Sequence, residues 1–479
     1  MRNGILNYHL GAGKDRGLKN LRQRWVLCAL LLSTLSGWLI TLDDRYALLV
    51  IGLLLFVVVY QYPIVGLVLM MALVPLGSIR LPMLTASKAA GWLTFAAWLA
   101  RKLFRRESFD RILDESKSLS PIVAFSVWAV LSVGWSTYYG DWWFSVRSYV
   151  QLLLLILLLI DLVDSEEKIK WLFIALIVSA SLSSLAAGVQ FFVGGGSWTE
   201  RVTGLHTDPN KLASTLAVAI PLSFYFLFSV KSWAARILFF SVIAVLSLGV
   251  AVSLSRTGWI SLFIIILLGM RTSIADKRAK VWRLLFVLFL LVISLVWILS
   301  SFDAFYVMEK RLLALFPGRA SILSTLSRLP TWRVAGIMIG ENWLLGVGSG
   351  NFVPLFPQFQ ALYKGPAAVY YGIGDRKAAH NAFIEIWAEL GLVGLLIFGV
   401  ILLQAFANLR KTRTVCARTN LLDGALTDWL GIAVLVYVFF GIFLNIEESK
   451  ILWGFVGLTI AMRRLGETGT REIACIDVS

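Results

Sequence analysis

The sequence predicts an all-α polytopic integral membrane protein with about 12–14 transmembrane helices. Two observations of composition carry the prediction: 58% of the 479 residues are hydrophobic, and only 15% are charged. A soluble domain of this size could not bury so much apolar surface. The third observation is the pattern, since apolar runs of roughly 15–22 residues recur along the chain between short charged loops. The ten-residue alternating segments of a transmembrane barrel are not seen in the sequence.

The apolar runs give fourteen expected spans, and some of them are shorter than the roughly 17 residues that a perpendicular helix needs to cross a bilayer. Tilted helices, re-entrant pieces or a miscounted pair would each account for short runs. The expected spans are about 25–42, 46–60, 62–79, 87–100, 119–136, 149–163, 171–190, 211–229, 237–254, 259–270, 284–300, 381–404, 427–445 and 450–463.

The formal charge of +16 follows the positive-inside pattern, which argues against a nucleic-acid partner. Most Lys and Arg residues fall in alternate short loops, including residues 101–106, 277–280 and 410–413. Loops on the other face are poorer in these residues and include the aromatic run 138–143, which is typical of a membrane interface. We therefore expect a multi-pass membrane protein with both termini in the cytoplasm.

One external segment is far longer than the other loops. Loops of this length are usually either functional or disordered. Aromatic residues such as Trp332, Trp343, Phe352 and Phe356 favour ordered packing, so we expect a lid over the active site. The expected organisation is a basic cytoplasmic tail (1–24), transmembrane helices 1–11 (25–300), one large periplasmic loop (301–380), C-terminal transmembrane helices (381–463) and a cytoplasmic tail (464–479).

The stretch 380–394 joins this long loop to an apolar helix, so its first residue is expected where water meets the bilayer. That residue is His380, one of only three histidines, and an imidazole with a pKa near 6.5 suits proton transfer. Glu385 and Glu389 follow in an otherwise apolar segment, where carboxylates are costly and are candidates for function. A plain helix start is the alternative, with His380 and Asn381 as a polar cap and Glu385 favoured by the helix dipole.

Three further polar clusters fall on the same external face. Arg201 opens a segment that ends in Asp208-Pro209-Asn210, which is also an ordinary helix entry. Arg256 lies between two spans, where an arginine could simply extend to the interface. Arg328 begins a third cluster, and beyond it the glycine-rich run 346–351 imitates a nucleotide loop. No predicted strand precedes that run and the dinucleotide spacing is absent, so a tight glycine turn is the better interpretation.

Together these clusters offer several arginines and one histidine on a face with few carboxylates. Arginine binds diphosphate through planar, charge-assisted hydrogen bonds, and it stays charged at any relevant pH. A nearby histidine can accept a proton from an attacking hydroxyl. No external acidic pair or histidine cluster has the spacing of a metal site, although Asp43-Asp44 is an isolated pair. We therefore expect a lipid diphosphate handled without a metal or another cofactor.

These motifs resemble the O-antigen ligase/polymerase superfamily, which includes Wzy-type polymerases, lipopolysaccharide O-antigen ligases and bacterial protein O-oligosaccharyltransferases. The resemblance covers roughly residues 195–400. Its pieces are the run 380–394, Arg201-x-x-Gly204 with Pro209-Asn210-x-x-Ala213, Ser255-Arg256-Thr257-Gly258, and Ser327-Arg328-x-x-x-Trp332 with the run 345–352. His206 does not match a position of the family pattern, while Arg147 and Arg333 are further basic candidates.

The resemblance implies a GT-C-like, metal-independent, inverting glycosyltransferase of the bacterial inner membrane, with a periplasmic active site. The donor would be an undecaprenyl-diphosphate-linked oligosaccharide, and the acceptor would be lipid A core or a lipid-linked glycan, with membrane lipids around the protein. One alternative is a protein hydroxyl as the acceptor. The other, from a different class of protein, is a transporter or flippase of lipid-linked glycan. Carried over by residue, His380 would be catalytic, Arg256, Arg328 and Arg201 would bind the diphosphate, and Asn210, Asn381, Glu385 and Glu389 would support the site.

Overall fold

The structure is a computed structural model that describes residues 44–77, 79, 85–194, 201–269, 328–362, 376–419 and 423–476. The expected spans 25–42 and 284–300 and the motif residue Ser327 lie outside the described residues. The helices are α2 (Asp44–Gln61), α3 (Pro63–Leu73), α4 (Ala86–Arg105), α5 (Asp110–Leu113), α6 (Ser116–Leu131), η1 (Ser132–Gly134), α7 (Tyr139–Leu162), α8 (Glu166–Val193), α9 (Pro209–Ser229), α10 (Trp233–Val252), α11 (Arg256–Gly269), α14 (Arg328–Glu341), α15 (Phe352–Leu362), α16 (Ala382–Thr419), α17 (Gly424–Phe440) and α18 (Lys450–Ile476).

The predicted all-α membrane fold is confirmed. Within the described residues, six apolar helical segments are long enough to cross a bilayer. They are Ser116–Gly134, Tyr139–Leu162, Glu166–Val193, Pro209–Ser229, Trp233–Val252 and Ala382–Ala417. Four shorter apolar helical segments accompany them: Val50–Gln61, Pro63–Leu73, Arg256–Gly269 and Gly424–Phe440. The total of 12–14 spans, which includes regions outside the description, stays a prediction.

The chain forms two compact units, and the candidate site lies entirely in the second. The first comprises residues 1–66 and 92–107, where Gly66 lets α3 approach the side chain of Thr94 on α4 closely. In the same unit Arg101 Nε lies 2.7 Å from Glu107 Oε1. The second unit comprises residues 67–91 and 108–479.

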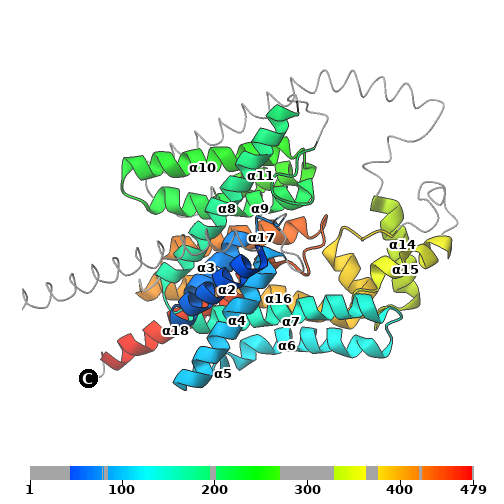
Figure 1. The fold of residues 1–479 in the computed structure, drawn as a ribbon, viewed down its shortest axis with the longest axis horizontal. Helices are drawn as coiled ribbons and strands as arrows, with labels where there is room; N and C mark the ends of the chain where they lie inside the picture. Colours follow the sequence, from blue (N-terminus) through cyan, green and yellow to red (C-terminus); the bar gives the residue numbers. More distant parts are fainter. Residues whose placement is uncertain are drawn as a thin grey trace, which may run out of the picture. The chain divides into compact units, whose positions relative to one another are not determined.

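Helix α9 is the most enclosed element of the second unit. Every residue from Leu212 to Leu227 is buried, and α9 packs against α8, α10, α11 and α17. Helix α16 packs against α6, α17 and α18, and α18 packs against α7 (Figure 1). Because α9 is enclosed by other helices over most of its length, it has no face exposed to water, which agrees with its mostly apolar sequence.

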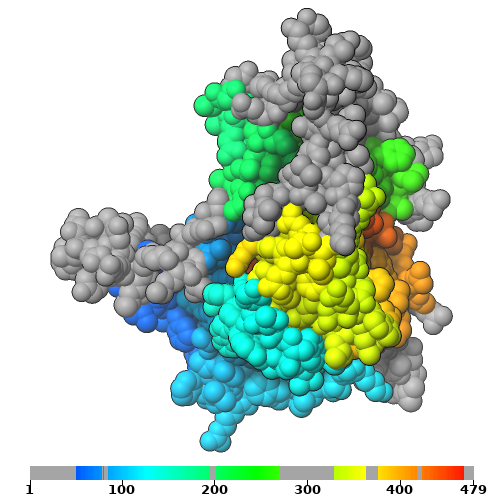
Figure 2. Space-filling view, turned by 90° about the vertical axis from the view of Figure 1, so that its right-hand side faces the viewer, coloured from blue at the N-terminus to red at the C-terminus, as the bar shows by residue number. Residues whose placement is uncertain are grey.

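Hydrogen bonds between connecting segments define one end of this unit. Asn351 Oδ1 accepts hydrogen bonds from the backbone N–H groups of Thr137 (3.1 Å) and Tyr138 (2.7 Å), just before α7. The N–H of Ala382, at the start of α16, donates to the carbonyl of Gly441 after α17 at 2.8 Å. The segment 328–362 therefore lies against the turn that joins α6 to α7, as Figures 1 and 2 show.

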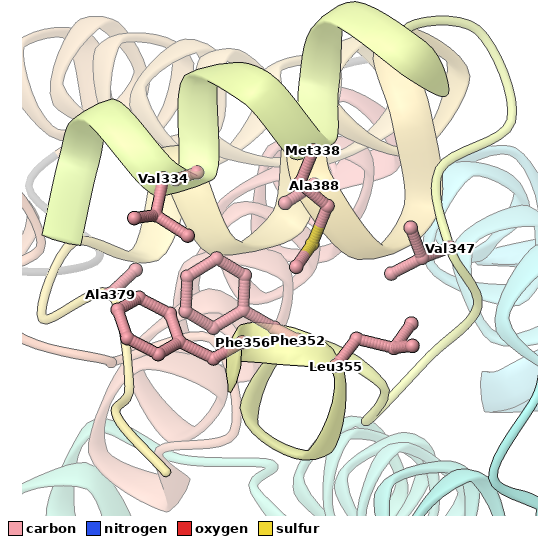
Figure 3. Close-up of a cluster of buried hydrophobic side chains, with 9 residues drawn as sticks. Val334, Met338, Val347, Phe352, Leu355, Phe356, Ala379 and Ala388 are labelled. Carbon is pink, nitrogen blue, oxygen red and sulfur yellow. The ribbon is translucent and has the colours of Figure 1, made fainter. Parts of the chain in front are cut away.

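Helices α14 and α15 belong to the segment expected as the large periplasmic loop, and they share a small core with α16. Figure 3 shows Met338 of α14 beside Ala388 of α16, with Phe352 and Phe356 of α15 below them. Both phenylalanines are completely buried, with exposed fractions of 0%. Burial of two such side chains contributes roughly 3–6 kcal/mol to ordering of this segment.

The glycine-rich run is a tight turn that pairs with the backbone of α16. Gly346, Gly348 and Gly350 have φ angles of +75°, +99° and +71°, values that favour glycine. The N–H of Gly348 donates to the carbonyl of Glu389 at 2.8 Å, directly before the kink of α16 at Gly391 (φ +67°). A side chain at Gly391 would collide with the carbonyl of Leu344, so both backbones approach closely only because glycine occupies the kink.

Candidate active site

The segment that leads into α9 is held by its own polar side chains. Asp208 caps the helix, since its carboxylate accepts hydrogen bonds from the N–H groups of Asn210 (2.8 Å) and Lys211 (3.2 Å). Pro209 occupies the first helical position, where a missing N–H costs nothing. The Asp-Pro-Asn sequence is thus a helix entry, and the same entry presents Asn210 to the neighbouring residues.

Asn210 joins two of the predicted motifs. Its Oδ1 accepts hydrogen bonds from Arg201 Nη2 at 2.8 Å and from Ser255 Oγ at 3.0 Å. Arg201 Nε also donates to the backbone carbonyl of Ser253 at 3.3 Å. The guanidinium of Arg201 is therefore fixed between the start of α9 and the turn that precedes Arg256, the first residue of α11.

That turn has an unusual backbone. Leu254 adopts φ +52°, and the carbonyl of Ser253 just before it contacts Arg201. The N–H of Ser255 donates to Ser253 Oγ at 3.3 Å, which closes the turn locally. The exposed side chain of Arg256 then follows directly. A left-handed conformation at a residue other than glycine costs of order 1–3 kcal/mol and is commonest at functional sites.

His380 also has a left-handed backbone, with φ +50°. Both of its neighbours are held in place. On one side Ala379 donates its N–H to Glu385 Oε2 at 3.0 Å, and its carbonyl accepts from Trp332 Nε1 at 2.9 Å. On the other side Asn381 caps α16, since its Oδ1 accepts from the N–H groups of Phe383 and Ile384, each at 3.0 Å. The surrounding contacts therefore fix the position of His380 although its own conformation is strained.

Arg328 starts α14, the helix that carries Trp332. Its guanidinium carbon lies 5.8 Å from the ring centre of Phe443, within the range of a cation–π contact. Phe443 belongs to the connection between α17 and α18, whose carbonyls at Gly441 and Leu444 accept the N–H of Ala382. Arg328 and the start of α16, two residues after His380, thus contact the same connection.

Electrostatic effects link these residues into one site. Burial, and then the positive charge of Arg328, lower the pKa of His380, while the carboxylate of Asp208 opposes the shift. Burial likewise lowers the pKa of Arg328, with Arg201 adding to the effect. The pKa of Arg201 is lowered by burial and by Arg256. The structure therefore brings Arg201, Arg256, Arg328 and His380 into one electrostatic neighbourhood with Asp208. The lowered pKa leaves the imidazole of His380 neutral at pH 7, although part of the residue is exposed to solvent.

The two predicted glutamates hold loops around the site. Glu385 and Glu389 are 8% and 7% exposed. Glu385 accepts hydrogen bonds from the N–H of Ala379 and from the side-chain amide of Asn445. Glu389 accepts from the N–H groups of Gly350 (2.8 Å) and Phe352 (3.1 Å). One carboxylate therefore supports the residue before His380, and the other supports the glycine turn.

His206, which matched no family motif, packs between two helices. Its Nδ1 lies 3.1 Å from Ser183 Oγ of α8, and its Nε2 lies 3.0 Å from Thr215 Oγ1 of α9. Burial first, and then Lys211, lower the pKa of His206 to about 4, against the opposing effect of Asp208. The ring is therefore neutral at pH 7 and ties the Arg201–Asn210 segment to both helices.

Two other basic residues were candidates. The guanidinium carbon of Arg147 lies 4.9 Å from the ring centre of Phe144, a cation–π contact. Arg333 lies on α14 and is exposed.

Sequence reasoning missed two acidic features. Asp208 was expected only as a turn signal, yet its carboxylate influences the pKa values of Arg201, Arg328 and His380. Glu448, in the short connection between α17 and α18, accepts a hydrogen bond from Ser145 Oγ at 2.9 Å, which links this connection to α7. Two consecutive glutamates between apolar spans, Glu447 and Glu448, were a signal that could have drawn attention to this connection.

Residues 242–399 match a protein-family model described as O-Antigen ligase. This match confirms the resemblance to the O-antigen ligase superfamily. The superfamily is generally enzymatic, of the ligase or polymerase type. The matched O-antigen ligase segment contains Arg256, Arg328 and His380, whereas Arg201 and Asn210 precede it. A search of curated proteins found no match.

Proposed function

We propose that the protein is an inner-membrane glycosyltransferase that moves a glycan from undecaprenyl diphosphate to an acceptor hydroxyl at the periplasmic face. The arrangement around His380 carries this proposal. A histidine that is neutral at pH 7 is held in a strained turn beside Arg328, and Arg201 and Arg256 lie in the same electrostatic neighbourhood. A neutral imidazole next to several guanidinium groups suits a reaction that releases both a proton and an anion.

The arginines would act on the leaving group. Undecaprenyl diphosphate gains negative charge as its bond to the sugar breaks, and fixed cations in a partly desolvated site stabilise that charge most in the transition state. Arg201 is already positioned by Asn210 and Ser253, so little side-chain entropy remains to be lost when the diphosphate binds. In this proposal Arg256 and Arg328 complete the diphosphate site, and leaving-group stabilisation needs no metal ion.

His380 would act on the acceptor. The acceptor oxygen attacks the anomeric carbon while an imidazole nitrogen takes its proton, and the bond from that carbon to the diphosphate oxygen breaks. Attack opposite the leaving group inverts the anomeric configuration. Asn381 and Glu385 would serve this step indirectly, because they hold the backbone on either side of His380.

The described part of the large loop would cover the reacting groups. Trp332 of α14 donates to the carbonyl beside His380, and α14 and α15 pack on the first turns of α16. This packing supports the proposal that the segment is a periplasmic lid, which would limit access of water to the donor sugar. Lipid A core, a second lipid-linked glycan or a protein hydroxyl would each be a chemically competent acceptor.

The proposal is tested with purified protein, a defined undecaprenyl-diphosphate oligosaccharide and a panel of the three acceptor classes. We expect glycan transfer in detergent, in the presence of EDTA, with loss of transfer in the His380→Ala variant. Activity that disappears in EDTA and returns with Mg²⁺ would contradict the metal-independent mechanism. Movement of intact donor across a vesicle membrane without transfer would instead support a flippase.

A further inference from the structure

A groove lies between α11, α16 and α17, far along α16 from the candidate active site. Arg410 is 18 residues beyond Leu392, the first residue after the kink of α16 at Gly391, which corresponds to about 27 Å of helix. That length is close to the roughly 30 Å hydrocarbon core of a bilayer. The groove has a volume of about 600 Å³. Its position and chemistry give it no part in the glycan transfer proposed above.

Polar and apolar residues are segregated along the groove. On α16, the lining residues Phe406, Leu409, Arg410, Arg413 and Thr414 form one helical face on which the apolar side chains come first. Helix α17 runs in the opposite direction after the connection near residue 423, so its polar lining residues come first and its apolar ones follow. From α17 the lining residues are Thr427, Asp428, Gly431, Ile432 and Leu435, and α11 contributes Leu268.

Both helices therefore place their polar groups near the connection and their apolar groups deeper in the bundle. The polar part carries net positive charge, because two guanidinium groups face one carboxylate. Arg413 Nε lies 3.0 Å from Asp428 Oδ1, so this arginine is already paired, whereas the exposed Arg410 adds a charge beyond that pair. A ligand that matches the groove has an anionic head, an apolar tail and access from the bilayer.

We infer that this groove binds an anionic glycerophospholipid, with its phosphate at Arg410 and Arg413 and an acyl chain along Phe406, Leu409 and Leu435. Basic residues at the membrane boundary attract anionic head groups, and apolar walls below them accept the acyl chain. With the orientation expected from the positive-inside pattern, this lipid belongs to the cytoplasmic leaflet. The site is thus distinct in leaflet and in ligand from the proposed donor site.

A second groove on the other side of α16 provides a contrast. It lies between α6 and α16 and is lined by Val400, Leu403 and Gln404 on α16 and by Lys117 and Pro121 on α6, among others. This groove has one lysine where the first has two arginines, and a lysine cannot bind a phosphate through two parallel hydrogen bonds. We therefore expect the strongest preference for anionic lipid at the groove that contains Arg410.

The test is native mass spectrometry of the full-length protein with equal amounts of phosphatidylglycerol and phosphatidylcholine that carry identical acyl chains. We expect phosphatidylglycerol to be retained preferentially. Arg410→Gln should lower that preference about fivefold, the effect of one cation near the membrane surface. Lys411→Gln is the matched control, because it removes the same charge from the next, exposed position, which does not line the groove, and should leave the preference unchanged.

A steric variant tests the same site without changing its charge. A Cβ atom at Gly431 would meet Leu409 Cδ1 at 3.7 Å, an ordinary contact, so Gly431→Leu should fold and fill the groove. We expect it to reduce the phosphatidylglycerol retained while glycan transfer continues. Equal retention of both lipids, or equal effects of Arg410→Gln and Lys411→Gln, would overturn the inference, whatever the outcome of the transfer assay.

Discussion

Asn210 provides the sharpest test of how the candidate site is built. Its Oδ1 accepts one charge-assisted hydrogen bond from Arg201 and one neutral hydrogen bond from Ser255. Such bonds contribute about 1.5–3 and 0.5–1.5 kcal/mol respectively. Since Arg201 is only partly shielded from solvent, the lower parts of these ranges apply, and Asn210→Ala should destabilise the arrangement by about 2 kcal/mol. That free energy corresponds to a loss of about 30-fold in affinity for a diphosphate that needs Arg201 in place.

Asn210→Asp separates the effect on stability from the effect on diphosphate affinity. The aspartate keeps an oxygen acceptor for Arg201 and Ser255, so the thermal unfolding temperature should stay close to that of the wild type. It also adds negative charge beside the proposed diphosphate site, so affinity for undecaprenyl diphosphate should still fall. Asn210→Ala should lower both quantities. The assays are thermal unfolding of the purified protein and equilibrium binding of undecaprenyl diphosphate.

The result that would refute this reasoning is an Asn210→Asp variant that binds undecaprenyl diphosphate as tightly as the wild type. In that case the diphosphate would not lie near Arg201.

Three further predictions address other parts of the account. Because the pKa of His380 is lowered from its ordinary value of about 6.5, the acid limb of the transfer rate should be centred below about pH 6.5; an acid limb centred above that pH would contradict the lowered pKa. The pKa of His206 in the folded protein is about 4, below the usual 6.5, so the free energy of unfolding should fall as the pH drops from about 6.5 to 4, by at most about 3 kcal/mol. His206→Gln should flatten this pH dependence of thermal unfolding, and an unchanged curve would refute the role given to His206. At Gly391, where φ is +67°, Gly391→Ala places a side chain against the carbonyl of Leu344 and should destabilise the packing of segment 328–362 on α16 by roughly 2 kcal/mol or more. Limited proteolysis within 328–362 should then be faster. The control Gly399→Ala, whose added Cβ would have no atom within 4 Å, should behave as the wild type.

Hydropathy and charge alternation were enough to predict the fold class. Helix α9 shows why, because its 21 residues are mostly apolar and are enough to cross a bilayer. The boundaries were less certain. Helix α7 begins at Tyr139, ten residues before the expected span, because its first turns are polar and aromatic and carry no hydropathy signal.

The motifs predicted which residues are brought together, but not how. Arg201 and Arg256 are 55 positions apart, and only the structure shows that Asn210 and the Ser253–Ser255 turn connect them. The left-handed conformation of His380 could not be anticipated either. The residues around His380 are held by Glu385, which is near in sequence, and by Trp332 and the α17–α18 connection, which are distant partners that no local pattern specifies.

The roles of Glu385 and Glu389 could not be predicted from the sequence either. A carboxylate in an apolar segment predicts function or polar pairing equally well. Hydrogen bonds to the N–H groups of Gly350, Phe352 and Ala379 show that Glu389 and Glu385 satisfy buried backbone groups. For Gly350 and Phe352, the close approach of the preceding segment to α16 depends on glycine at positions 346 and 391.

The most direct measurement is the single-turnover rate of glycan transfer by the purified protein and its His380→Gln variant, with binding of undecaprenyl diphosphate measured in parallel. Because a general base typically contributes a factor of 10²–10⁴, the variant should transfer glycan at least about 100-fold more slowly and bind the lipid with nearly unchanged affinity. A variant that transfers glycan at the wild-type rate would contradict the assignment of His380 and the site built around it.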